Sequence, residues 1–296
     1  MPFFVLKLSF LRLSLLLSYI HNNAFVTKAG TVTVSGTANV TQAGTISGFT
    51  KAVVYSISDV PANALTAVAA AYNEAVDITI SGNVTYEKAK AVDDASNSGT
   101  STYTINDTAA LITAGIGTKV AAVDNATSVT ANSNATFAEA ATMSGIATAI
   151  SYSISDEQAN IPGSTTGAIN EAIDITITND VTFAQAKIID DGSNSGSNTY
   201  NVNDTASNLA SGTVTSVNAL NGAGTVTASS IANATEAAKL AAISKAVTYS
   251  ISDTAANIVA NIGGLNESNN ITATSSATYG QAKIIKDATN DDSKTY

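Results

Sequence analysis

Three acidic stretches of this sequence carry side chains whose types and spacing suit a metal ion. They read Asp93-Asp-Ala-Ser-Asn-Ser-Gly99, Asp190-Asp-Gly-Ser-Asn-Ser-Gly196 and Asp287-Ala-Thr-Asn-Asp-Asp292. Carboxylate and amide oxygens at alternate positions, with a glycine that permits a sharp turn, are what calcium prefers. The same residue types are also ordinary turn formers, so a plain turn is the alternative. The calcium hypothesis assigns the ligands to Asp93, Asp94, Asp190, Asp191 and Asp287.

A second set of polar residues recurs in short phrases in which Thr or Ser alternates with an apolar residue. If these phrases are strands, their hydroxyls point to one face of a sheet, where neighbouring strands lie about 4.8 Å apart. Such a face could recognise a polysaccharide or ice, or it is a solvated surface kept small and polar. The predicted rows consist of Thr31, Thr33, Thr79, Ser81, Ser128, Thr130, Thr176, Thr178, Thr225, Thr227, Thr272 and Thr274.

The composition excludes several kinds of catalytic and binding site. The sequence has no Cys, which removes disulfides, metal thiolates and thiol nucleophiles. Its single histidine is His21, so an arrangement of nucleophile and imidazole base lacks its parts. A formal net charge of -10 opposes binding to a phosphate backbone. We therefore expect neither an enzyme nor a nucleic-acid partner.

The tyrosines reveal an internal repeat. The phrase Tyr-Ser-Ile-Ser-Asp begins at Tyr55, Tyr152 and Tyr249, at intervals of 97 residues, and Tyr103 and Tyr200 begin variants of it midway between these. The Thr/Ser phrases lie between successive tyrosines, so a strand-like phrase returns every 22 to 25 residues. Every phrase alternates apolar and polar side chains, which is the period of a β-strand.

An Ala-rich stretch follows each phrase and predicts a short helix. The aspartate that ends each tyrosine phrase directly precedes such a stretch, and aspartate is a favoured N-cap. After the other phrases, Thr136, Thr182 and Thr278 are each followed three residues later by Glu or Gln, the spacing of a capping box. The predicted N-cap aspartates are Asp59, Asp107, Asp156, Asp204 and Asp253.

One strand and one short helix cannot bury their own apolar faces, whereas stacked copies can. We therefore expect an α/β solenoid of about eleven stacked strand–helix coils of 22–25 residues, with a parallel sheet on one side. Tandem all-β sandwich domains are the alternative. The solenoid would span 29–296, with full units at 55–151 and 152–248 and partial units at 29–54 and 249–296. Because neither end of the repeats shows a polar capping coil, we also expect end-to-end self-association.

The first 28 residues differ from the repeats. They begin with an apolar stretch that contains Lys7 and Arg12, and the run from Leu13 to Ile20 is apolar before polarity rises. This order predicts a signal or export segment at 1–28. An interfacial helix and a misassigned start are the alternatives.

Two stretches resemble a known class of repeats. Tyr249–Asn257 (YSISDTAAN) and Thr278–Ile285 (TYGQAKII) are similar to tandem repeats of large bacterial cell-surface proteins, such as giant adhesins and surface-layer-like proteins. The resemblance covers 29–296 and implies an extracellular or cell-surface location, with a structural or adhesive role and no catalytic residue. We therefore expect a spacer or scaffold. A module that binds polysaccharide or ice through its Ser/Thr/Asn face, and a filament-forming protein, are the alternatives.

Overall fold

A computed structural model describes residues 5–8, 31–49, 52–64, 70–215, 217–290 and 292–296 of the chain. The predicted export segment at 1–28 lies outside these described residues, except for Val5–Leu8. The chain forms two compact units. The first consists of Met1–Asn134 and Thr142–Tyr152, and the second of Ala135–Ala141 and Ser153–Tyr296.

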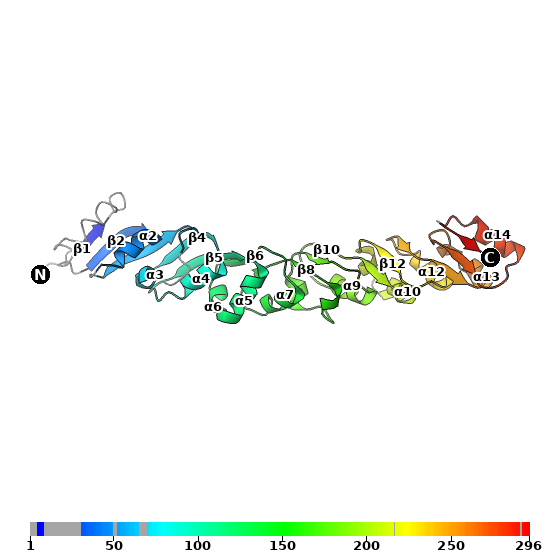
Figure 1. Ribbon diagram of the computed structural model, residues 1–296, viewed down its shortest axis with the longest axis horizontal. Coiled ribbons are helices and arrows are strands. Elements are labelled where there is room, and N and C mark those ends of the chain that lie inside the picture. Colours follow the sequence, from blue (N-terminus) through cyan, green and yellow to red (C-terminus); the bar gives the residue numbers. More distant parts are fainter. Residues whose placement is uncertain (1–4, 9–30, 50–51, 65–69, 216, 291) are drawn as a thin grey trace. The chain divides into compact units, whose positions relative to one another are not determined.

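The first unit is built on one parallel sheet in which each strand pairs with the next strand along the chain (Figure 1). Apolar residues of these strands alternate into the core, as Val53, Tyr55 and Ile57 do. The strands are β1 (Val5–Leu8), β2 (Thr31–Ala38), β3 (Val53–Asp59), β4 (Ile78–Val84), β5 (Ser101–Asp107), β6 (Ser128–Ala131) and β7 (Ile150–Ser151).

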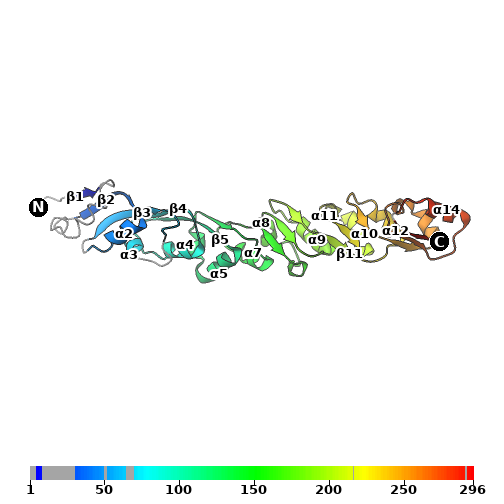
Figure 2. The same ribbon diagram turned by 45° about the horizontal axis from the view of Figure 1, so that its top comes forward.

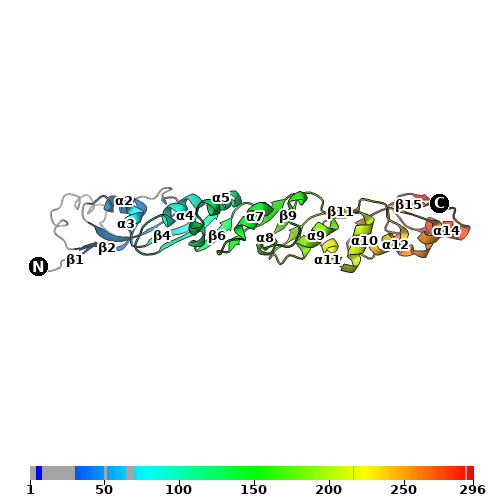
Figure 3. The same ribbon diagram turned by 90° about the horizontal axis from the view of Figure 1, so that it is seen from below.

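Short helices connect the strands of the first unit and lie along one face of its sheet (Figures 1 and 3). They are rich in alanine, and Ala43, Ala89 and Ala122 are fully buried, which lets each helix pack closely on its neighbours. The helices are α2 (Val40–Ile46), α3 (Ala70–Glu74), α4 (Tyr86–Asp93), α5 (Ala109–Lys119) and α6 (Ala121–Asp124).

The second unit has the same alternation of strand and helix, but its strands are shorter and fall into three separate parallel sheets. The first contains β8 (Ile154–Asp156), β9 (Ile175–Ile177) and β10 (Asn198–Thr199). The second contains β11 (Val202–Asp204), β12 (Val226–Ala228) and β13 (Val247–Thr248). The third contains β14 (Ile251–Asp253), β15 (Ile271–Ala273) and β16 (Lys294–Thr295).

Helices of the second unit lie beside these strands and pack on one another (Figures 2 and 3). α7 (Phe137–Met143) begins in this unit. The others are α8 (Gly167–Glu171), α9 (Phe183–Asp190), α10 (Ala206–Thr215), α11 (Val217–Asn221), α12 (Ala234–Leu240), α13 (Ala255–Ala260) and α14 (Tyr279–Asp287), with 3-10 turns η3 (Gln158–Asn160) and η4 (Ile262–Gly264).

The predicted solenoid of about eleven coils on one shared sheet is wrong, and so is the alternative of all-β sandwich domains. The sheets are separate and parallel, and helices alternate with the strands. The reason lies in the Thr/Ser phrases. β2 and β4 continue past Gly36 and Gly82, where φ is 100° and 115° and the strand register shifts. Glycine adopts this backbone without steric cost, which lets each of these strands absorb two extra residues and continue.

Later phrases lack that glycine. The equivalent positions hold Ser133, Asn179, Ser230 and Ser275, and none of the described residues other than glycine has a positive φ. The strands β6, β9, β12 and β15 therefore end early. The tyrosine phrases beside them divide into two short strands, such as Ile150–Ser151 and Ile154–Asp156, which pair in different sheets.

Buried tyrosines join the tyrosine phrases to helices that come later in the chain. The hydroxyls of Tyr55, Tyr103 and Tyr200 donate to the carbonyl oxygens of Ala71, Ala122 and Ala219, over 2.7, 2.9 and 2.8 Å. Burial, with a smaller contribution from nearby Glu74, raises the pKa of Tyr55 to about 12. Each tyrosine thus fills the core with its ring and satisfies a buried carbonyl with its hydroxyl.

The predicted capping boxes are confirmed. Thr182 and Thr278 accept a hydrogen bond from the amide of the glutamine three residues later, and that glutamine's side chain accepts from the threonine's amide. Thr136 and Glu139 form the same pair of bonds. The prediction that the phrase aspartates are N-caps is wrong for Asp107 and Asp253, because the N-cap is the next residue, Thr108 or Thr254.

Candidate functional site

The structure arranges some of the predicted hydroxyl residues in short rows that run across the sheets. In each row a threonine occupies the middle strand and has Ser, Thr or Asn beside it on both neighbouring strands. All of these side chains are exposed or half-buried. The rows are Ser58–Thr79–Thr102, Asn106–Thr130–Ser151, Ser155–Thr176–Thr199, Asn203–Thr227–Thr248 and Ser252–Thr272–Thr295.

The remaining predicted row residues do not join these rows. Thr33 pairs with Val54, Ser128 pairs with Thr104, and Thr31 pairs with Val5. Ser81 lies in the register shift of β4, and Thr178, Thr225 and Thr274 lie just outside the strands β9, β12 and β15. The wide array predicted from the sequence is therefore replaced by separate rows, each three residues long.

The hydroxyls of the threonines in the middle of each row can bind water or a ligand. Within the described residues, the hydroxyls of Thr79, Thr130, Thr176, Thr227 and Thr272 make no hydrogen bond to the protein. Their neighbours stand on strands about 4.8 Å apart, which is the spacing of any sheet. A row can offer donors and acceptors at regular intervals to water or to a hydroxylated ligand.

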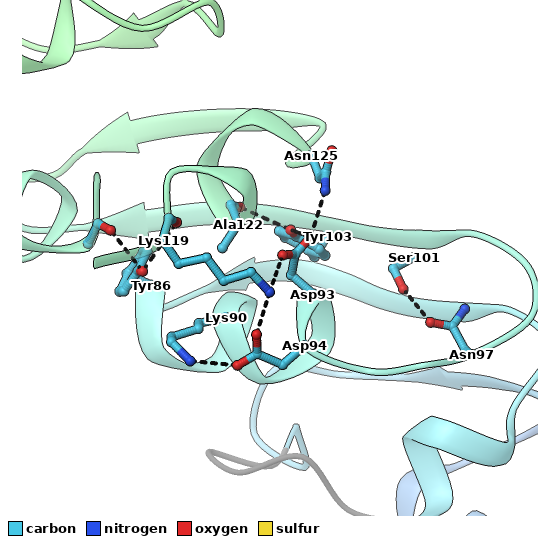
Figure 4. A network of polar contacts seen from close by, with 11 residues as sticks. Tyr86, Lys90, Asp93, Asp94, Asn97, Ser101, Tyr103, Lys119, Ala122 and Asn125 are labelled. Atoms are coloured by element: carbon cyan, nitrogen blue, oxygen red, sulfur yellow. Dashed lines mark hydrogen bonds and ion pairs between the residues drawn. The ribbon is translucent and has the colours of Figure 1, made fainter. Parts of the chain in front are cut away.

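Asp93 and Asp94 lie together at the end of α4, where a lysine from α5 contacts both of them (Figure 4). The Lys119 ammonium is 2.7 Å from one oxygen of Asp93 and also contacts Asp94, which Lys90 contacts as well. The side-chain amide of Asn125 donates to Asp93 over 2.7 Å. Hydrogen bonds from Lys119 and Lys90 hold the pKa of Asp94 below its ordinary value. Lys119 thus places a positive charge against both carboxylates.

The other two acidic stretches are built differently. Lys187 contacts Asp191, and Lys283 contacts Asp287, in each case from the preceding turn of the same helix. No hydrogen bond or ion pair reaches the Asp190 carboxylate within the described residues. Burial, together with the charge of Asp191, raises the pKa of Asp190. In the described part of the chain, no three His, Cys, Asp or Glu side chains group closely enough to hold a metal ion.

The calcium hypothesis is tested most directly at Asp190 and Asp191, because Lys119 already neutralises Asp93 and Asp94. It predicts a melting temperature that rises in millimolar calcium and falls in chelator, since a ligand of the folded state stabilises it. The rise should disappear in Asp190→Asn and persist in Asp93→Asn. Calorimetric melting curves that are identical in calcium and in chelator would leave these stretches as lysine-paired turns.

The aspartate of each tyrosine phrase has a role that the sequence did not indicate. The tyrosine phrases divide each 97-residue repeat into two half-repeats. One carboxylate oxygen of the aspartate accepts a hydrogen bond from the first amide of a helix in the preceding half-repeat, as Asp107 does from Tyr86 and Asp204 from Phe183, both over 3.0 Å. The other oxygen accepts from the amide of the next residue. The same bonds recur at Asp59, Asp156 and Asp253. These residues are therefore cross-links between consecutive half-repeats.

These cross-links predict a loss of stability in acid. Burial alone would raise the pKa of Asp59, Asp156 and Asp253, but hydrogen bonds from an asparagine side chain and two backbone amides hold each pKa below its ordinary value. A lowered folded-state pKa contributes stability above the unfolded value of about 4, and that contribution is lost as the pH falls through the folded value. Urea unfolding should therefore require less denaturant at low pH than at neutral pH. Midpoints independent of pH in this range would contradict it.

Two hollows occur at equivalent positions of the repeat. One, of about 480 Å³, is lined by Val40, Gly44, Asn63 and Ala71 in the first unit. The other, of about 450 Å³, is lined by Phe137, Ala141, Asn160 and Ala168 in the second unit. The sequence did not predict these hollows. The feature that could have indicated them is the small residue on the helix face, Gly44 in the first hollow and Ala141 in the second. Their mostly apolar lining presents no catalytic group apart from the cross-linking Asp156.

Comparison with protein-family models, with curated proteins and with solved structures finds no match to this chain. The geometry of the repeats must therefore carry the functional argument.

Proposed function

We propose that this chain is a structural or adhesive repeat region of an extracellular or cell-surface protein, in which it acts as a spacer or scaffold. The observation that carries the proposal is the aspartate cross-link, which recurs in the same form at each of the five tyrosine phrases. An active site is usually a single group of residues, whereas each of these carboxylates joins one half-repeat to the next. Their hydrogen bonds hold neighbouring half-repeats together.

Other observations support the location. The sequence resembles repeats of bacterial surface proteins, and its low content of Lys and Arg suits a soluble acidic surface. Within the described residues, no helix has the length and apolar character needed to cross a bilayer.

Force spectroscopy tests the proposal. The full chain, held between two handles, should resist load and then lengthen in discrete steps. Release of one 97-residue repeat would add about 35 nm of contour length, and release of a half repeat about half of this. The steps should occur above the force at which an unfolded chain extends. A chain that lengthens smoothly, without steps, would contradict a load-bearing role.

A matched pair of variants makes this measurement specific. Asp204→Ala removes a cross-link between Phe183 and the following half-repeat, so steps from the second unit should move to lower force. Asp191→Ala removes only an exposed ion pair and should leave the forces unchanged. If the two variants behave alike, the cross-links do not carry the load.

A second candidate function is a binding module that uses the Ser/Thr/Asn rows for polysaccharide or ice. The observation that favours it is the set of row threonines whose hydroxyls have no partner within the described residues. Thr176→Lys should interrupt the row Ser155–Thr176–Thr199 without unfolding the chain, because Thr176 is only half-buried. A polysaccharide array and an ice-recrystallisation assay measure the effect, with Ala184→Lys on exposed α9 surface as the control. Equal activity in both variants would exclude the rows.

A further inference from the structure

The sequence contains nine Asn-x-Ser/Thr motifs, in which a hydroxyl residue follows an asparagine after one residue other than proline. This is the motif that accepts N-linked oligosaccharides. A chain rich in Asn, Ser and Thr contains many such motifs by chance, so the fold decides which of them is available to an enzyme. The nine asparagines are Asn39, Asn83, Asn106, Asn125, Asn134, Asn203, Asn233, Asn266 and Asn270.

In eight of the nine motifs the asparagine or the hydroxyl already has a partner. Asn39 and Asn233 are N-caps, and each side chain accepts a hydrogen bond from the amide three residues later. The side chain of Asn134 is free, but the hydroxyl of its motif, on Thr136, is hydrogen-bonded to Glu139. The other asparagines with hydrogen-bonded side chains are Asn106, Asn125, Asn203, Asn266 and Asn270.

The motif that begins at Asn83 differs from the others, because both of its polar side chains are exposed and have no hydrogen-bond partner among the described residues. Between them Val84, the last residue of β4, is 1% exposed, and Thr85 has an extended backbone. Alternate residues of an extended chain point to the same side, so Asn83 and Thr85 both face solvent there. Thr85 is the N-cap of α4, yet its hydroxyl makes no capping bond. An enzyme that reads the amide and the hydroxyl together therefore reaches both without breaking a contact.

We propose that Asn83 is a site of N-linked glycosylation. The donor is an oligosaccharide carried on a lipid pyrophosphate. The side-chain nitrogen of Asn83 forms a bond to the anomeric carbon of the first sugar, and the bond from that carbon to the pyrophosphate oxygen breaks. The amide loses one proton and the lipid pyrophosphate leaves. The inference rests on the proposed extracellular location, because transferases of this class act on chains that have crossed a membrane.

The hydrogen bonds of the folded chain predict an order of modification. The capped asparagine Asn39 has to release the bond from the Gln42 amide before its side chain can react, whereas Asn83 has no bond to release. An N-cap bond of ordinary strength makes the released form about fivefold rarer. The folded chain should therefore gain an oligosaccharide at Asn83 about five times faster than at Asn39.

Two variants of Thr85 test whether the motif is read as a unit. Thr85→Val removes the hydroxyl and should abolish modification of Asn83. Thr85→Ser keeps the hydroxyl and should retain the modification. Both variants should melt like the wild type, since the Thr85 side chain is exposed and makes no capping bond. A reaction at Asn83 that persists in Thr85→Val would overturn the proposal.

Mass spectrometry measures the reaction on the full folded chain, incubated with an oligosaccharyltransferase and a lipid-pyrophosphate-linked oligosaccharide. Trypsin cleaves after Lys28, Lys51 and Lys88, so the peptide 52–88 contains the motif of Asn83 alone and the peptide 29–51 that of Asn39 alone. The peptide 52–88 should gain the mass of one oligosaccharide, and the peptide 29–51 should gain it about fivefold more slowly. No gain in 52–88, or equal rates in the two peptides, would overturn the assignment to Asn83.

The protein isolated from its native source gives a second readout, which separates this inference from the proposed function. Protein recovered from the cell surface should carry the oligosaccharide on the peptide 52–88. An unmodified peptide 52–88 in that fraction would overturn the glycosylation of Asn83 and leave the proposed location intact. A protein that does not reach the surface would overturn the proposed location, and this inference with it.

Discussion

Ile251→Asp is expected to unfold the second unit. Ile251 is buried in β14, where it pairs with Ile271 of β15 and bridges to Ala232. A carboxylate there would be buried without a charge partner, which is among the costliest single changes. We expect a loss of about 4 kcal/mol or more in the free energy of unfolding. Urea denaturation followed by circular dichroism measures it, and the first unit provides an internal reference.

The neighbouring residue supplies a control with the same new charge. Ser252 belongs to the same strand but lies half-buried on the opposite face, in the row with Thr272. Ser252→Asp should change the stability by less than about 1 kcal/mol, since its carboxylate can reach water. If the serine variant were the less stable of the two, the assigned strand faces would be reversed.

Asp204→Ala is expected to have the second-largest effect, because it breaks a cross-link between half-repeats. Its carboxylate accepts hydrogen bonds from the Phe183 amide, the Thr205 amide and the Asn208 side chain, over 3.0, 2.7 and 2.8 Å. Asp204 and the Phe183 amide are buried, so removing the carboxylate leaves a donor without a partner. We expect a loss of about 3 kcal/mol in the free energy of unfolding.

Asp191→Ala is the matched control. The exposed carboxylate of Asp191 pairs with Lys187, a surface ion pair of the kind that contributes less than about 1 kcal/mol. Both free energies come from urea unfolding at neutral pH. Equal stability of the Asp204 and Asp191 variants would show that the cross-link is dispensable and would weaken the proposed scaffold role.

The sequence alone was sufficient for the local structure, because the signals involved are short in range. Alternation of apolar and polar residues predicted the strands and their buried faces, as Val53, Tyr55 and Ile57 illustrate. Thr182 and Gln185 lie three residues apart, so their capping box could be predicted without knowing the fold. The outward position of the row threonines followed from the same alternation.

The sheet arrangement was decided by a backbone property that periodicity does not contain. Gly36 and Gly82 adopt a positive φ, so β2 and β4 continue, whereas Ser133 and Ser230 do not adopt it and the strands end. The replacement of this glycine by serine in later phrases was visible in the sequence. Its effect depends on whether the strand must pass through a left-handed conformation, which only the packed structure determines.

The polar contacts were decided by tertiary structure for a related reason. Asp107 was predicted to cap the helix that follows it, but the fold brings it to the first amide of a helix 21 residues earlier. Lys119 lies 25 residues from Asp94 and contacts it only because α5 packs against α4. A carboxylate takes whichever donors the fold leaves without a partner, and those donors are fixed only when neighbouring repeats pack together.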